Sequence, residues 1–171
     1  MRAAAALICL GILAWSAPVD AATANSLTLQ TLPLGWGIAE LRYERLITGP
    51  LSLVAIGGYG KGASWSPFAG QSRTHAGGQA RWRMGGDFGD GVSLAAEALW
   101  MWSSGDGSYG AKGLAIGAKM LAKWTIGPGF VVEAQVGAAR VSRRAAPIGG
   151  GKDLQAVDWQ PAVGLGVGYG W

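Results

Sequence analysis

The stretch Val163-Gly-Leu165-Gly-Val167-Gly-Tyr169-Gly-Trp171 decides the fold class of this chain. Because successive side chains of a β-strand point to opposite faces, the large residues of this stretch share one face and the glycines share the other. A strict period of two therefore predicts a strand with one large apolar face. Such a face suits contact with lipid, and we expect strands of the same kind elsewhere in the chain.

The same stretch resembles the C-terminal assembly signal of bacterial outer-membrane proteins, in which a terminal Phe or Trp follows alternating apolar residues. The residues that match this signal are Leu165, Val167, Tyr169 and Trp171. The resemblance implies recognition by the barrel-assembly machinery during insertion into the bacterial outer membrane.

The first residues predict export. Met1-Arg2 is followed by an apolar run from Ala3 to Ala17 and then by small residues, as in a secretory signal peptide. We expect residues 1–24 to be the signal peptide and 25–171 to be an outer-membrane β-barrel domain; cleavage after Ala21 and an uncleaved anchor are the alternatives. Cys9, the only cysteine, lies in the signal peptide, so a disulfide or a cysteine metal site is not expected in the mature chain.

Composition supports a barrel and argues against other classes. Residues 25–171 hold no run of 18 apolar residues, which excludes a spanning helix there, although half of the chain is hydrophobic. Thirty glycines and nine tryptophans suit crowded strands with interfacial aromatic residues. The net charge of +4 is modest and does not resemble a nucleic-acid-binding surface.

Alternating segments are separated in turn by short and longer connections, as expected where short turns face the periplasm and long loops face outward. The predicted strands are residues 51–60, 75–86, 91–102, 111–125, 130–142 and 155–171. An even number of crossings requires the stretch from Ser26 to Ile47 to turn at Pro33-Leu34-Gly35 and supply two more. The sequence thus predicts an all-β, eight-stranded, antiparallel up-and-down transmembrane β-barrel. In architecture it resembles the small outer-membrane barrels of the OmpA and OmpX kind.

Charged residues and large apolar residues fall on opposite faces of these strands. The charged face holds five acids and five bases: Glu40, Arg42, Glu44, Arg81, Arg83, Glu97, Lys119, Lys123, Glu133 and Asp158. An eight-stranded barrel is just wide enough for side chains to fill it, so we interpret this set as a paired charge network in the lumen. The segment 51–60 stays ambiguous, because large residues occupy both of its faces.

Tryptophans and tyrosine near the strand ends predict two aromatic girdles. Trp36, Trp100, Trp102 and Trp159 fall near outer ends, while Trp124, Tyr169 and Trp171 fall near inner ends. The competing architecture is a soluble periplasmic ligand-binding barrel similar to a lipocalin, with apolar residues inside and charges outside. The girdles and the low charged fraction of 14% favour the membrane barrel.

No constellation predicts catalysis, a metal site or a cofactor. His75 is the only histidine, and a lipid A deacylase barrel would need a His-x-Ser motif where Ala76 and Gly77 follow it. We interpret His75 as a solvated residue at a loop edge. The segments Asp87–Asp90 and Gly105–Gly107 indicate turns rather than a calcium loop. Gly149–Lys152 does not match a phosphate loop, because Ala146 replaces the first Gly and Asp153 replaces the Ser or Thr.

The loops and their basic rims are the remaining candidates for interaction. The loop from Lys61 to Thr74 carries Trp65, Pro67 and Phe68, and Arg140, Arg143, Arg144 and Lys152 cluster at another outer rim. The expected partners are outer-membrane lipid and lipopolysaccharide, together with a possible surface partner through the loops. A structural or surface-interaction role is the leading hypothesis; an envelope lipid-modifying enzyme and a narrow channel are the alternatives.

Overall fold

The computed structural model describes residues 24–35, 37–61, 72–85, 87–104, 109–147 and 154–171. The elements are β1 (Asn25–Gln30), α2 (Thr31–Gly35), β2 (Ile38–Thr48), β3 (Leu51–Lys61), β4 (Ser72–Gly85), β5 (Gly91–Ser104), β6 (Tyr109–Ile126), β7 (Phe130–Pro147) and β8 (Leu154–Gly170). The predicted signal peptide and Trp36 lie outside the described residues. None of the helices within those ranges is long and apolar enough to cross a membrane.

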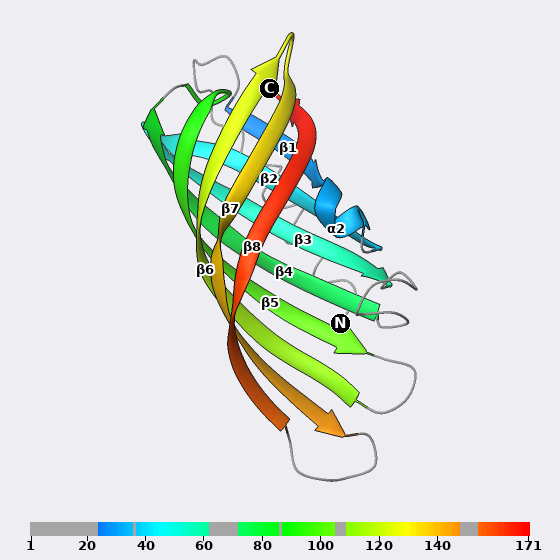
Figure 1. The fold of residues 1–171 in the computed structure, drawn as a ribbon. Helices are drawn as coiled ribbons and strands as arrows, with labels where there is room; N and C mark the ends of the chain where they lie inside the picture. The colour runs from blue at the N-terminus through cyan, green and yellow to red at the C-terminus, as the bar shows by residue number, and fades with distance from the viewer. Residues whose placement is uncertain (1–23, 36, 62–71, 86, 105–108, 148–153) are drawn as a thin grey trace.

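The eight strands form one closed barrel in which each strand pairs with its neighbours in sequence (Figure 1). β8 closes the barrel on β1, with Ser26 opposite Gly170 and Gln30 opposite Gly166. All pairs are antiparallel. The predicted all-β, eight-stranded, antiparallel up-and-down barrel is therefore confirmed. Along Ser26–Gln30, closure pairs backbone groups that would otherwise stay open at a sheet edge, whereas residues 154–165 of β8 pair within the sheet with β7 alone.

The N-terminal segment divides where the sequence predicts it. β1 ends at Gln30 and β2 begins at Ile38, so Pro33-Leu34-Gly35 lies between them. The connection is a short helix, α2, rather than a simple turn. The Thr31 hydroxyl donates a hydrogen bond of 2.8 Å to the carbonyl of Leu165, which ties the start of α2 to β8.

Short and long connections lie at opposite ends of the barrel, which we name the turn end and the loop end. The turn end carries the connections after β2, β4 and β6, where Gly49 and Gly127 adopt positive φ values of 45° and 61°. The loop end carries α2 and the connections after β3, β5 and β7. β7 extends to Pro147, beyond the predicted end at 142, because its hairpin with β6 continues pairing backbone groups as far as Tyr109.

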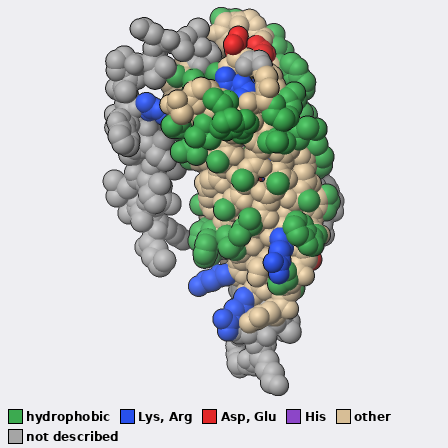
Figure 2. Space-filling view, turned by 90° about the vertical axis from the view of Figure 1, so that its left-hand side faces the viewer, with side chains coloured by type: hydrophobic (Ala, Val, Ile, Leu, Met, Phe, Trp, Pro, Cys, Tyr) green, Lys and Arg blue, Asp and Glu red, His purple; other side chains and the backbone are tan. Residues whose placement is uncertain are grey.

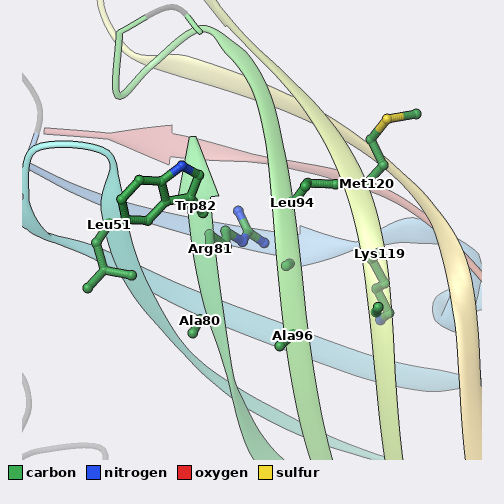
Figure 3. Close-up of a pocket in the computed structure, with 10 residues that line it drawn as sticks. Leu51, Ala80, Arg81, Trp82, Leu94, Ala96, Lys119 and Met120 are labelled. Carbon is green, nitrogen blue, oxygen red and sulfur yellow. The ribbon is translucent and has the colours of Figure 1, made fainter. Parts of the chain in front are cut away.

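Polar side chains and a smaller number of apolar ones, such as Val54 and Ile56, face the interior, whereas most of the large apolar side chains face outward. Trp82 and Met120 are 57% and 49% exposed, whereas Arg81 and Lys119, their neighbours in sequence, are 3% and 8% exposed. Figure 3 shows an outer groove lined by a cross-strand row of Leu51, Trp82, Leu94 and Met120 and by the neighbouring Ala80 and Ala96. The ambiguous segment is also resolved: the even-numbered residues of β3, from Ser52 to Ile56, are buried.

The aromatic residues of the predicted girdles that the structure describes face outward. Trp100, Trp102 and Trp159 lie toward the loop end, and Trp124, Tyr169 and Trp171 lie toward the turn end. Trp82 joins the turn-end group, a position that the sequence analysis did not include. Tyr169 stacks on Trp171 with ring centroids 6.5 Å apart, so part of this group is in direct contact.

Candidate functional site in the barrel interior

The interior is built from alternate residues of the strands, and its buried members are mostly polar. The buried polar side chains are Ser26, Thr28, Gln30, Glu40, Arg42, Glu44, Ser52, Gln79, Arg81, Glu97, Lys119, Lys123, Glu133 and Gln135. Four acids and four bases are included, so the buried charges balance. Their mutual arrangement decides whether the interior is a filled core or a binding site.

Arg81 lies at the centre of the first charge cluster. Its guanidinium donates two hydrogen bonds to Glu133, Nη1 to Oε2 at 2.5 Å and Nη2 to Oε1 at 3.0 Å, and Nη1 also donates to Glu44 at 2.9 Å. Lys123 pairs with the same Glu44 carboxylate. A planar guanidinium holds a carboxylate through two parallel bonds, which fixes direction as well as distance. This cluster joins β2, β4, β6 and β7 across the lumen.

Arg42 lies at the centre of a second cluster, nearer the loop end. Its Nε donates to Glu40 at 2.7 Å, and its Nη2 lies 3.6 Å from Glu97. Lys119 Nζ lies 2.6 Å from the other oxygen of Glu97. His75 Nε2 lies 2.7 Å from Glu40 Oε2. Each carboxylate of this cluster is therefore shared between two side chains that can carry positive charge.

Neutral amides connect the two clusters, although the buried Gln30 Nε2 has no hydrogen-bond partner among the described residues. Gln79 accepts from Arg81 Nε and donates to Glu97 at 3.2 Å, so it links the clusters directly. Gln135 accepts from Arg42 at 2.8 Å and donates to Gln30 at 3.0 Å. The glycine face of β8 makes room for them: a Cβ added at Gly164 would lie 2.4 Å from Gln135 Nε2.

A phenylalanine from a turn closes the interior at the turn end. Phe88, in the connection between β4 and β5, is 8% exposed and has Lys123 Nζ 4.4 Å and the Arg83 guanidinium 5.5 Å from its ring centroid. The turn is fastened to β6, because the Thr125 amide donates to Asp90 at 2.6 Å and its hydroxyl donates to the Gly89 carbonyl at 2.7 Å. From its sequence, this segment is predicted only to be a turn. The single aromatic residue between an aspartate and a glycine was the one feature that could have indicated a buried side chain there.

The ten residues of the predicted lumen charge network differ in how deeply they are buried. Eight are buried and belong to the two clusters: Glu40, Arg42, Glu44, Arg81, Glu97, Lys119, Lys123 and Glu133. Arg83 is half-buried beside Phe88. Asp158 is exposed, lies 3.8 Å from Arg143 and accepts a hydrogen bond from Gln160, apart from the buried clusters.

His75 differs from its interpretation as a solvated loop-edge residue. β4 begins at Ser72, so His75 lies within a strand, and its side chain is only 14% exposed. The signal was available, because His75 shares its parity with Gln79 and Arg81 on the same strand. Gly58, directly opposite on β3, leaves space for the ring: a Cβ there would lie 2.2 Å from the imidazole.

The interior offers little chemistry beyond charge pairing. Among the described residues, no group of three His, Cys, Asp or Glu side chains is placed to hold a metal ion. The pair of His75 and Glu40 has the form of a base with its orienting carboxylate, but hydrolysis would also need an activated nucleophile beside the imidazole. The absence of catalytic, cofactor and metal residues stays a prediction.

Comparisons with known proteins yield no relative. No protein family, curated protein or solved structure shows significant similarity to this chain.

Proposed function

We propose that this chain is a small integral β-barrel of the bacterial outer membrane with a structural or surface-interaction role, and that its lumen is closed by paired charges. The observation that carries the proposal is the inverted polarity of the barrel. Charged residues are buried inside, while large apolar residues such as Leu41 and Ile116 are more than half exposed outside. A soluble ligand-binding barrel would have the opposite arrangement.

The outer surface supports a lipid environment. Exposed apolar side chains occur on all eight strands, from Leu27 on β1 to Tyr169 on β8, and Figure 2 shows many of them on one face. Exposure of this many large apolar side chains is unfavourable in water but favourable against acyl chains. Pairing of Ser26–Gln30 with β8 also closes the barrel, and the backbone groups of the paired strands are satisfied internally, as the hydrocarbon region demands.

The filled interior favours a structural or surface role over transport. Glu133, Gln30 and Ser26 are each 1% exposed. The two charge clusters together extend across the lumen. Such a network stabilises a barrel by joining opposite walls. Contacts with other molecules are then expected on the outer surface and at the loop end.

Separation of cell membranes followed by electrophoresis tests this proposal. The expected result is that the protein is found in the outer-membrane fraction and migrates differently before and after boiling in detergent, because a closed barrel resists detergent until heated. A protein found in the soluble periplasmic fraction with no heat-dependent shift would overturn the proposal and make an internal ligand the leading idea.

A further inference from the structure

Outward residues of β6, β7 and β8 form three cross-strand rows toward the loop end. In order toward that end, the rows are Ile116–Arg140–Trp159, Leu114–Ser142–Val157 and Lys112–Arg144–Gln155. Three of these nine positions are cationic and none is acidic. Arg143 and Asp158, which alternate with these positions along the strands, belong to the opposite face. We call the nine residues the basic patch.

The cations of the basic patch lie close together. Lys112 and Arg144 are directly opposite each other in the hairpin of β6 and β7, and both are exposed. Directly opposed residues have Cβ atoms only about 5 Å apart, and like charges at such positions repel. Arg140 lies four residues along β7 from Arg144, about 13 Å at the usual rise of a strand, with Ser142 midway. Three cations are therefore placed along one outward face within about 13 Å of β7 and its β6 neighbour.

The basic patch also spans the edge of the apolar outer surface. Arg140 lies between Ile116 and Trp159, which are 58% and 72% exposed. The stretch from Phe130 at the turn end to Arg140 projects to about 25 Å on the barrel axis at a typical strand tilt, which is about the height of a lipid-facing band. Figure 2 shows basic side chains gathered at the lower part of the face in view, where Figure 1 places the loop-end parts of β7 and β8.

We propose that the basic patch binds a phosphorylated lipid, with the phosphates of lipid A as its headgroup ligand. This inference depends on the proposed membrane function, which puts the loop end at the outer leaflet. Arg140, Arg144 and Lys112 donate charge-assisted hydrogen bonds to phosphate oxygens, and the guanidinium geometry suits phosphate. Apolar neighbours on both sides, such as Ile116 and Trp159, contact the acyl chains, which a free anion would not require.

Native mass spectrometry of the full chain, folded in detergent micelles, tests the basic patch. The probes are bisphosphorylated lipid A and the same lipid with both phosphates removed. We expect the phosphorylated lipid to be retained with an affinity at least about tenfold higher, the effect of one or two charge-assisted hydrogen bonds. Equal retention of both lipids would overturn the proposal.

Variants locate the binding. Arg140→Gln should weaken retention about tenfold, and the triple substitution of Lys112, Arg140 and Arg144 by Gln should abolish the preference for phosphate. Lys61→Gln is the matched control, because Lys61 is an exposed outward cation at the loop end of β3, away from the basic patch. Equal losses in Arg140→Gln and Lys61→Gln would assign the effect to general charge and contradict the proposal.

Two further measurements separate the sources of failure. Inorganic phosphate at the lipid concentration should displace no lipid; full displacement would indicate a site for a free anion and overturn the assignment to lipid. Each variant should keep the heat-dependent electrophoretic shift of a folded barrel. If the unchanged chain fractionates with the outer membrane but shows no preference for phosphorylated lipid A, the lipid-binding proposal is wrong and the proposed function stands. If the chain is found in the soluble periplasmic fraction, the proposed function itself is wrong.

Discussion

Arg81 and Glu133 face each other across the lumen through two parallel hydrogen bonds of 2.5 Å and 3.0 Å, from strands that are not neighbours in the sheet. The arginine is 3% exposed and the glutamate 1%. Glu44 shares the same guanidinium, and Lys123 supplies the second positive charge that balances the two carboxylates. The pair therefore connects opposite walls of the barrel, which no backbone hydrogen bond does.

Arg81→Ala should destabilise the folded barrel by about 3–5 kcal/mol, because it leaves buried carboxylates without their counter-charge. Urea unfolding in detergent micelles measures the change. The control is Arg143→Ala, which removes a half-exposed ion pair with Asp158 at 3.8 Å and should cost less than about 1 kcal/mol. Equal unfolding midpoints for Arg81→Ala and the unchanged chain would contradict a stabilising network. Glu97→Ala tests the second cluster in the same way and should also destabilise the barrel.

The sequence predicts which residues enter the interior but not how they pair. A period of two assigns Glu40, Arg81 and Glu133 to one face from their spacing alone. Their contacts depend on how the barrel closes and on the stagger in register between distant strands. The residue spacing within one strand does not determine either of these. The exposed position of Asp158 also depends on closure, because β1 pairs with β8 only at Gly166–Gly170 and Asp158 has a neighbouring strand on its β7 side alone.

Two further differences arise where local pattern and tertiary structure disagree. His75 follows a long loop-like segment, but pairing with β3 and β5 extends β4 back to Ser72 and turns the imidazole toward Glu40. Phe88 belongs to a turn, where no periodicity indicates a direction. The cations of Lys123 and Arg83 attract its ring into the barrel end.

Met120→Lys should distinguish a lipid-facing surface from a water-facing one. Met120 is half-exposed on the outer face of β6 and borders the groove in Figure 3. A lysine near the middle of a bilayer costs about 2–4 kcal/mol, whereas at a water-facing position it costs almost nothing. Unfolding in lipid vesicles measures the difference. Thr74→Lys, on the outer face at the loop end of β4, should be nearly neutral, and equal effects at the two positions would argue against a lipid-facing belt.

Gly58→Ala should disturb the contact between His75 and Glu40, because the new Cβ would lie 2.2 Å from the imidazole. Displacing the ring should cost about 1–3 kcal/mol, as other overpacking substitutions do. Gly57→Ala is the matched control, since a Cβ at that neighbouring glycine meets no atom within 4 Å. Unfolding of the two variants in the same detergent gives the comparison; a Gly58→Ala barrel as stable as Gly57→Ala would mean that His75 is not held against Glu40.

Phe88→Ala should weaken the closure of the turn end. Removing a buried aromatic side chain costs about 3–5 kcal/mol in a well-packed site, and part of that loss here comes from the cations of Lys123 and Arg83 beside the ring. Phe88→Leu separates the two contributions, because it keeps an apolar side chain but removes the ring face, and it should cost about 0.5–2 kcal/mol through the lost cation–π contacts.

Planar-bilayer recordings test whether the interior is closed, because a closed interior predicts no steady unitary conductance in the unchanged chain. Steady conductance in that chain would favour the channel alternative, whereas conductance that appears only in Phe88→Ala would identify this ring as the seal at the turn end.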